Sequence, residues 1–352
     1  MVFASGIGVF IRNVVPRLMR LRPDIRFLLL GREEKLADAG LLQGDVMVKS
    51  FESPIYGISE QLWWCQNRID ADLIWTPHYN VPLFNRTPLL VTIHDLAHLA
   101  LPDFQRSFIK SQYARTLFAA AKRKSAALMF VSEFTHSEFK KYLGAPTCHS
   151  AVIGCGVDPV WFEPQGAAGE AKPHIVFVGN VKPHKNLPRL LRAFSAICDT
   201  VPHDLILVGN KDGFITRDEE TPRLVEKLGG RVRMTGLIPD ADVRHIVASA
   251  DALVMPSLYE GFGLPVVEAM ACGCPVLSSN LASLPEVGGS AVLYCNPLDE
   301  TDIAARLKDI LTDPSLRTKL KAAGRSRAHH FNWDNVAEKV SGCITAGFGS
   351  LF

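Results

Sequence analysis

A buried strand, a tight loop and a short helix are predicted in direct succession within residues 252–278, and this succession is the strongest constraint on the fold. Apolar residues 252–255 form the strand, which ends at Pro256. Pro265 suits the first position of the helix, because the N–H that proline lacks would have no partner there. Gly273 ends the helix, and a second apolar strand begins soon after it. Strands that alternate with helices in this way are typical of a parallel α/β sheet.

The loop between this strand and this helix combines two glycines with two carboxylates. Gly261 and Gly263 allow backbone N–H groups to approach an anion closely, and the positive end of the helix dipole favours a phosphate there. Glu260 and Glu268 flank the loop, and since carboxylates do not bind phosphate, we expect them to contact hydroxyl groups. A diphosphate between a ribose and a hexose would satisfy the whole loop. The stretch therefore predicts a nucleotide-sugar site; a glycine-rich turn with two solvated glutamates is the plainer alternative.

Residues 260–265 read Glu-Gly-Phe-Gly-Leu-Pro, and Glu268 stands eight positions after Glu260. This pattern resembles the donor signature of the retaining glycosyltransferases of family 4, which have the GT-B fold. The resemblance implies an α/β protein with two Rossmann-like parallel-sheet domains that face each other across a cleft. The segments at residues 5–8 and 93–96 look most like the mannosyl- or rhamnosyl-transferring branch of that family.

The domain boundaries follow from composition and from this resemblance. Residues 158–173 are polar and contain several prolines and glycines, which is typical of a linker. We expect an acceptor-side Rossmann-like domain over residues 1–160 and a nucleotide-sugar-binding one over residues 171–330. By analogy, residues 331–352 form a helix that crosses back to the first domain. Family members usually have a strand before the turn at residues 6–8, and this first N-terminal strand is missing from the pattern here.

The resemblance implies catalytic roles for His94, Lys185 and Glu260. Lys185 follows the first strand of the second domain, where a compact cation suits a departing diphosphate. Relatives commonly carry an arginine and a lysine here, and His184 or Asn180 stands where many of them have the arginine. His94 follows an apolar strand, at the edge where parallel sheets bind ligands. Its position fits a core histidine bonded to a backbone carbonyl equally well.

The resemblance also implies a set of donor-binding residues: Gly8, Lys185, Glu260, Gly261, Phe262, Gly263, Leu264 and Glu268. Glu268 would bind the ribose hydroxyls, and Glu260 would hold the 3- and 4-hydroxyls of the hexose. Lys185 and the N–H groups of the loop would hold the diphosphate, and Gly8 would add an N–H on domain closure. His94 would contact the hexose or shape the acceptor site. The implied reaction passes through an oxocarbenium-like state, with attack on the face that the phosphate leaves.

Composition argues against several other classes of protein. The formal net charge of +2 gives no general attraction to nucleic acid. None of the eight cysteines forms a Cys-x-x-Cys pair, so we expect no metal and no cofactor. The Asp-x-Asp spacings at Asp70 and Asp240 are explained by a turn and by a helix start. No apolar run reaches the ~18 residues of a membrane-spanning helix, and no signal peptide is visible, so we expect a cytoplasmic protein.

The segment from Phe104 to Lys124 predicts a basic amphipathic helix. Such a helix can lie on an anionic membrane, so peripheral contact with the inner face of the cell membrane stays open. A solvated helix face whose lysines extend over the core is the commoner explanation of the pattern.

Together, these motifs predict a retaining glycosyltransferase that moves a hexose to a glycan or lipid-linked acceptor in surface polysaccharide synthesis. Mannose is the first candidate for the sugar and GDP-mannose for the donor, with UDP-glucose or another UDP-sugar second. No nucleic-acid partner is expected. Two other functions stay open: a non-catalytic nucleotide-sugar-binding protein, and a nucleotide-sugar epimerase, which would need an acid–base set that we do not find.

Overall fold

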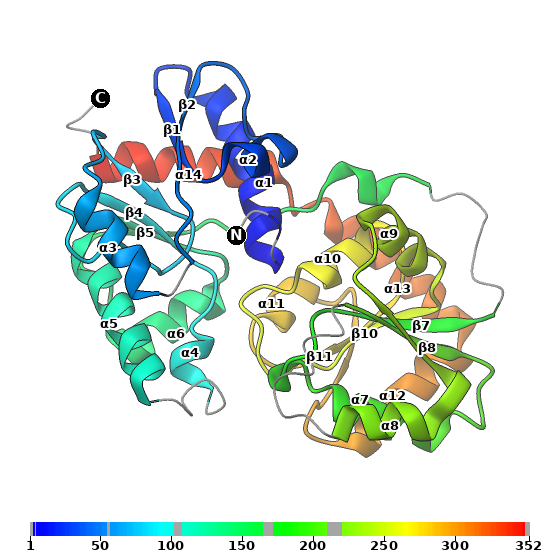
Figure 1. Ribbon diagram of the computed structural model, residues 1–352. Coiled ribbons are helices and arrows are strands. Elements are labelled where there is room, and N and C mark those ends of the chain that lie inside the picture. The colour runs from blue at the N-terminus through cyan, green and yellow to red at the C-terminus, as the bar shows by residue number, and fades with distance from the viewer. Residues whose placement is uncertain are drawn as a thin grey trace. The chain divides into compact units, whose positions relative to one another are not determined.

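The structure, a computed structural model, describes residues 3, 5–54, 57–101, 108–164, 172–209 and 220–348 of the chain. It divides into two compact units, each built around parallel strands (Figure 1). The first unit consists of residues 1–156 and 332–352, and the second of residues 157–331. The chain therefore passes from the first unit to the second and returns to the first for its last helix.

The first unit contains two parallel sheets, with the orders β1-β2 and β3-β4-β5-β6. Its strands are β1 (Phe27–Leu30), β2 (Val46–Lys49), β3 (Ile74–Thr76), β4 (Leu89–Ile93), β5 (Ser125–Phe130) and β6 (His149–Val152). Its helices are α1 (Ser5–Leu21), α2 (Glu33–Asp38), α3 (Ile58–Gln66), α4 (Ala97–Ala100), α5 (Phe108–Lys124), α6 (Glu133–Leu143) and α14 (Trp333–Phe348).

Helices cover both faces of the four-stranded sheet, which explains why its central strands β4 and β5 are mostly apolar. Every residue of β4 is buried. The helices α5 and α6 pack Phe118 and Phe139 against one face, while α14 packs against β5 and β6 from the other (Figure 1). The ring of Trp333, at the start of α14, lies edge-on to Phe10 of α1 at 5.9 Å between centroids. The last helix of the chain thus completes the core of the first unit.

No strand precedes α1 in the part of the chain that the structure describes. The described strands of the two sheets of this unit are not hydrogen-bonded to each other. Both sheets instead pack against the same helix, α1. Ile11 and Val15 of α1 pack with Leu29 of β1, Val48 of β2 and Trp75 of β3 in a single apolar cluster. The helix α1 therefore joins the two sheets through side chains.

The second unit has one parallel six-stranded sheet with the order β12-β11-β10-β7-β8-β9. Its strands are β7 (His174–Val178), β8 (Asp204–Val208), β9 (Val232–Gly236), β10 (Ala252–Met255), β11 (Val276–Ser279) and β12 (Leu293–Cys295). Its helices are α7 (Leu187–Ile197), α8 (Glu220–Leu228), α9 (Asp240–Ser249), α10 (Leu264–Ala271), α11 (Leu284–Gly288), α12 (Glu300–Thr312) and α13 (Pro314–Ala328), with short 3-10 turns η2 (Pro159–Phe162), η3 (Pro183–Lys185) and η5 (Gly229–Arg231).

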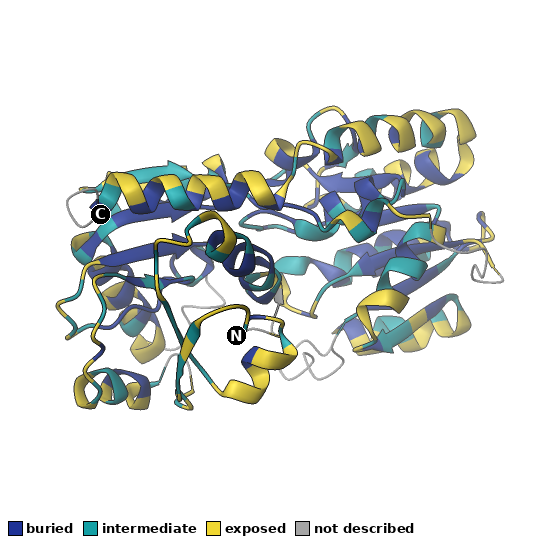
Figure 2. Ribbon diagram, turned by 90° about the horizontal axis from the view of Figure 1, so that it is seen from above, coloured by how far each residue is buried: buried dark blue, intermediate teal, exposed yellow. Residues whose placement is uncertain are grey.

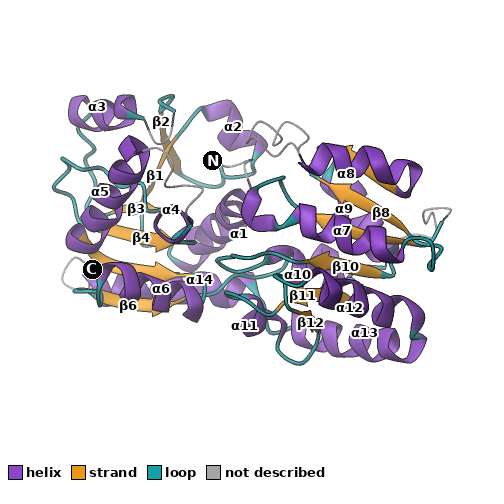
Figure 3. Ribbon diagram, turned by 90° about the horizontal axis from the view of Figure 1, so that it is seen from below, coloured by secondary structure: helices purple, strands orange, loops and turns teal. Residues whose placement is uncertain are grey.

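This sheet is wound on both faces, with α7, α8 and α12 on one and α9 and α10 on the other (Figures 1 and 3). The strands are mostly buried, while the helices expose one side (Figure 2). Phe177, Phe194 and Leu307 form part of a core cluster between the sheet and the helices α7 and α12. The predicted α/β architecture, with two Rossmann-like parallel-sheet units, is confirmed. The predicted linker begins with the turn η2, and its residues 165–171 lie outside the described residues.

Candidate active site

The order of strands in the second unit creates one point where neighbouring loops run apart. The chain builds β8 and β9 on one side of β7, and β10, β11 and β12 on the other. Since β7 and β10 are parallel neighbours, the loops that follow them leave the same edge in opposite directions. Ligands of open α/β sheets bind at such a switch point. The two loops are residues 179–186 and 256–263, which contain the basic loop and the glycine motif.

The switch point brings together two of the predicted catalytic side chains. The ammonium group of Lys185, on η3, lies 2.6 Å from Oε1 of Glu260. Both side chains are largely buried, with 15% and 12% of their surface exposed. A buried ion pair of this kind keeps two charges in place that would be costly to bury singly.

Glu260 is held as a carboxylate by its surroundings. Burial raises its pKa, but the charge of Lys185, hydrogen bonds from Lys185 and Ser257, and the nearby His184 together bring the pKa below its ordinary value. Asn180 and Lys182 are exposed. Of the side chains that could replace the arginine of relatives, His184 is the one whose charge contributes to the lowered pKa of Glu260.

The glycine loop is fixed so that its N–H groups face away from the sheet interior. The buried hydroxyl of Ser283 lies 2.9 Å from the carbonyl oxygens of Glu260 and Phe262. In a trans peptide the N–H points opposite to the carbonyl, so the N–H groups of Gly261 and Gly263 point away from Ser283. Gly263 has φ 104°, a conformation that favours glycine, and it leads directly into α10. These two N–H groups therefore point to the same side of the loop, as the binding of an anion by the loop would require.

Glu268 lies on α10, and its charged neighbours are acidic, whereas those of Glu260 are basic. Burial raises its pKa to about 7, and the charges of Asp240 and Asp158 contribute in the same direction. Asp158 caps η2, and Asp240 begins α9. Near neutral pH the carboxyl group is therefore often protonated, so it can both donate to and accept from a pair of hydroxyl groups.

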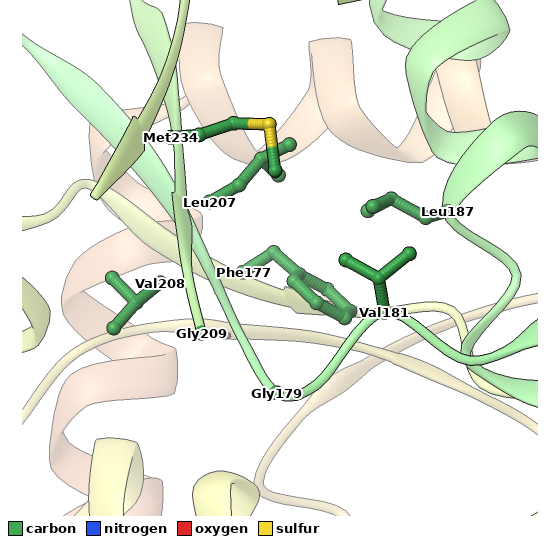
Figure 4. A pocket seen from close by; sticks show the side chains of 8 residues that line it. All are labelled: Phe177, Gly179, Val181, Leu187, Leu207, Val208, Gly209 and Met234. Carbon is green, nitrogen blue, oxygen red and sulfur yellow. The ribbon is translucent and has the colours of Figure 1, made fainter. Parts of the chain in front are cut away.

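A shallow apolar depression lies beside this site, at the carboxyl ends of β7, β8 and β9 (Figure 4). Its lining residues are Phe177, Gly179, Val181, Leu187, Leu207, Val208, Gly209 and Met234. The backbone is tightly packed here: a Cβ on Gly209 would lie 2.1 Å from the carbonyl oxygen of Gly179. Only glycine fits at this strand end.

His94 and Gly8 belong to the first unit. His94 follows β4, and its Nε2 atom lies 3.0 Å from the carbonyl oxygen of Pro77. A carbonyl can only accept, so Nε2 carries the hydrogen and Nδ1 is left as an acceptor. Burial lowers the pKa of His94 to about 4, against the smaller opposing effects of Asp95 and of the Pro77 carbonyl, so the ring is neutral. Gly8 is buried in the first turn of α1. The hydrogen bond to a backbone carbonyl, which the interpretation of His94 as a core histidine predicts, is therefore present.

Sequence reasoning missed two further histidines at this edge. His78 follows β3 and is buried, which lowers its pKa well below the usual value, with His94 and His98 acting in the same direction. Nδ1 of His98 lies 3.1 Å from the hydroxyl group of Tyr79. The signal was available in the sequence, because Pro-His-Tyr-Asn at residues 77–80 directly follows the residues that form β3.

The predicted basic helix is α5, and part of its charge is used internally. Phe104 and Arg106 lie outside the described residues. The ammonium group of Lys124 donates to the carbonyl oxygens of Pro82, Leu83 and Asn85 at 2.7–2.9 Å, and Lys122 donates to that of Leu143. These two lysines hold loops together, and the exposed basic face is smaller than the sequence suggested.

Comparison with known proteins supplies the family. The family model for glycosyl transferases group 1 matches residues 162–327, and the model for glycosyltransferase family 4 matches residues 4–161. O-antigen chain mannosyltransferase B of Escherichia coli is 30% identical over 264 residues, which is 71% of this chain and 68% of the relative. The serotype-specific mannosyltransferase WbdA of Escherichia coli is 34% identical over 166 residues, and that match spans 46% of this chain and 20% of the relative.

Among solved structures, Alr3699/HepE of Anabaena in complex with UDP and glucose has a TM-score of 0.78 at 19% identity and covers 97% of this chain and 96% of its own. At that identity the likeness shows the fold alone, and it confirms the predicted GT-B fold. Taken with the two family models, which follow each other along the chain, these matches show that the protein belongs to the group 1 glycosyltransferases and is a glycosyltransferase enzyme.

Proposed function

We propose that this protein is a retaining mannosyltransferase that uses a nucleotide-sugar, GDP-mannose first, and acts on a glycan or lipid-linked acceptor in surface polysaccharide synthesis. The observation that carries the proposal is the pair of Lys185 and Glu260 at the switch point, beside a loop with outward N–H groups. The names of relatives such as O-antigen chain mannosyltransferase B support the sugar and the pathway. The ion pair thus provides Lys185 for the diphosphate of the donor and Glu260 for its hexose.

In the proposed reaction each side chain has one task. Glu268 binds the ribose hydroxyls, and Glu260 binds the hexose hydroxyls. Lys185 and the N–H groups of residues 261–263 stabilise the diphosphate as the bond between the sugar and phosphate breaks. The acceptor oxygen attacks the oxocarbenium-like carbon on the same face, and its proton passes to the departing phosphate oxygen. His94, through the free lone pair of Nδ1, is proposed to orient an acceptor or hexose hydroxyl, and Gly8 to donate an N–H.

The nucleotide is tested by a melting-temperature screen of the intact protein with GDP-, UDP- and TDP-sugars. A ligand that binds only the folded state raises the melting temperature by mass action. We expect the largest shift with GDP-mannose. A larger shift with a UDP-sugar would replace the nucleotide but keep the transferase proposal, and the Anabaena structure in complex with UDP makes this the second candidate.

Turnover is tested with the variant Glu268→Ala. We expect wild-type protein to transfer the sugar to an acceptor and the variant to lose both donor binding and turnover. Unchanged turnover in the variant would remove Glu268 from the donor site. Donor binding without transfer to any acceptor in a panel would favour a binding protein, and an epimeric donor formed without acceptor would favour an epimerase.

We also propose that the first turn of α5 contacts an anionic membrane surface. Phe108 and Ile109 expose 75% and 80% of their surface, and Lys110 and Arg115 are exposed on the same helix. No helix in the described part of the chain is both long and apolar enough to cross a membrane. In flotation with phosphatidylglycerol vesicles, Ile109→Glu should reduce binding, while equal binding by the variant and wild type would refute this contact.

A further inference from the structure

Asn186 is a buried residue in an unusual backbone conformation, directly after the lysine of the site. It has φ 61° and ψ 32°, in the left-handed region, and only 3% of its surface is exposed. Its Nδ2 atom donates to the carbonyl oxygens of Pro256 at 3.0 Å and Pro297 at 2.7 Å. Its Oδ1 atom accepts from Nη1 of Arg189 at 3.0 Å. Both hydrogens and the oxygen of the amide are therefore used, and the guanidinium group fixes which way the amide is turned.

The three loops that Asn186 joins all leave the same edge of the sheet. Asn186 ends the loop after β7, Pro256 starts the loop after β10, and Pro297 follows β12. A second tie runs beside the first, because the N–H of Leu258 donates to the carbonyl oxygen of His184 at 2.7 Å. These two hydrogen bonds flank Lys185 in the sequence, and its partner Glu260 follows Leu258 in the glycine loop. The register of the two loops is thus set by fixed groups on both sides of Lys185.

The ion pair alone cannot set this register. Lysine carries its charge on a flexible four-carbon stem, so its ammonium group can follow Glu260 through a range of backbone positions. A short amide that is buried and bonded at three atoms has no such freedom, and buried polar groups are costly to leave unpaired. A shift of about 1 Å in a positioning group can reduce a rate about 100-fold.

We propose that Asn186 is a positioning residue of the donor site, which holds the loop of Lys185 in register with the glycine loop. This inference rests on the proposed transferase function. The amide touches neither donor nor acceptor in this role. It keeps the ammonium group and the loop N–H groups at the spacing that one diphosphate requires, so the transition state depends on it more than donor binding does.

The test compares Asn186→Gly and Asn186→Asp with wild type. Glycine keeps the left-handed backbone at little cost but removes the amide. Aspartate keeps the size but places a carboxylate against two carbonyl oxygens. We expect kcat to fall about 10- to 100-fold in Asn186→Gly, with KM for the donor changed less than about threefold. The kcat of Asn186→Asp should fall at least as much. This second variant provides the test if the glycine variant folds poorly.

Arg231→Gln is the matched control, because Arg231 holds loops together at the opposite edge of the same sheet. Its guanidinium group donates to the carbonyl oxygens of Cys198, Val201 and His203 at 2.6–2.8 Å. We expect Arg231→Gln to lower the melting temperature and to leave kcat and KM within about twofold of wild type. This control separates the effect of lost stability on kcat from the effect of a displaced Lys185 loop.

A double-mutant cycle with Lys185→Ala completes the test. If Asn186 acts by placing Lys185, Asn186→Gly should reduce kcat much less in the Lys185→Ala background than in wild type. Equal losses in both backgrounds, or a kcat for Asn186→Gly equal to that of wild type, would overturn the inference. Absence of donor binding and turnover in the wild-type protein would instead refute the proposed function, so the two failures are distinguishable.

Discussion

Replacing Glu268 by glutamine should make the unliganded second unit more stable at alkaline pH, although Glu268 is proposed to bind the donor. Its pKa in the folded protein is about 7, against a usual value of 4.5, because burial and two neighbouring aspartates disfavour the charge. The folded state therefore keeps a proton that the unfolded chain loses. The resulting stabilisation is complete below about pH 4.5 and is lost as the pH rises through about 7.

The magnitude follows from the size of the shift. A pKa of about 7 in place of 4.5 corresponds to about 3 kcal/mol, and because the residue is only partly buried, about 2 kcal/mol is the better expectation. Glutamine does not ionise, so Glu268→Gln should match wild type near pH 5 and exceed it by about 2 kcal/mol at pH 8. In a unit of this size that is a rise of about 4–8 °C in melting temperature.

Denaturant unfolding of both proteins at pH 5 and pH 8 measures the effect. Glu226→Gln, the same change at an exposed position of α8, is the control and should leave the pH dependence as in wild type. Asp240→Asn should act in the same direction as Glu268→Gln but more weakly, because it removes only one of the neighbouring charges. If Glu268→Gln followed the wild-type stability curve at both pH values, the carboxyl group would titrate normally and the reasoning would be wrong.

Three further predictions concern other parts of the structure. Lys185→Ala should lower the free energy of unfolding by about 3 kcal/mol, because it leaves Glu260 buried without its partner, and Lys185→Met combined with Glu260→Gln should recover most of that loss in denaturant unfolding. The stability of the first unit should fall by up to about 3 kcal/mol from pH 6.5 to pH 4, because the folded pKa of His94, about 4, lies below its usual 6.5 and only the unfolded chain gains the proton; His94→Gln should flatten this part of the curve. Gly209→Ala should cost about 3 kcal/mol, since its Cβ would lie 2.1 Å from a backbone oxygen, whereas Gly230→Ala, with no atom within 4 Å of its Cβ, should cost less than about 1 kcal/mol in the same unfolding assay.

Local chemistry made much of the fold predictable. Pro265 and Gly273 gave the start and end of α10, which runs from Leu264 to Ala271. These signals act within one turn of the chain, so no tertiary information was needed to use them. The strands β2 and β12 are not indicated by the sequence analysis, because they are only partly buried and lack the fully buried apolar run that indicates the equally short β10.

The candidate site was predictable as a set of residue types but not as a set of contacts. A lysine and a glutamate after two strands were both assigned to the donor, yet their meeting depends on β7 and β10 being neighbours. The supporting groups were missed for the same reason. Ser283 acts on a carbonyl 23 positions away, and Asn186 on one 111 positions away, so neither bond leaves a local trace in the sequence.

The return of the chain to its first unit has a consequence for synthesis. Trp333 is 1% exposed in the core of the first unit, but it leaves the ribosome only after all of the second unit. The nascent protein can therefore finish its later half before its earlier half, contrary to the usual order. Until α14 is synthesised, α1 and β5 expose apolar surface to solvent or to a chaperone, so a chain cut before residue 332 should aggregate through the half that was made first.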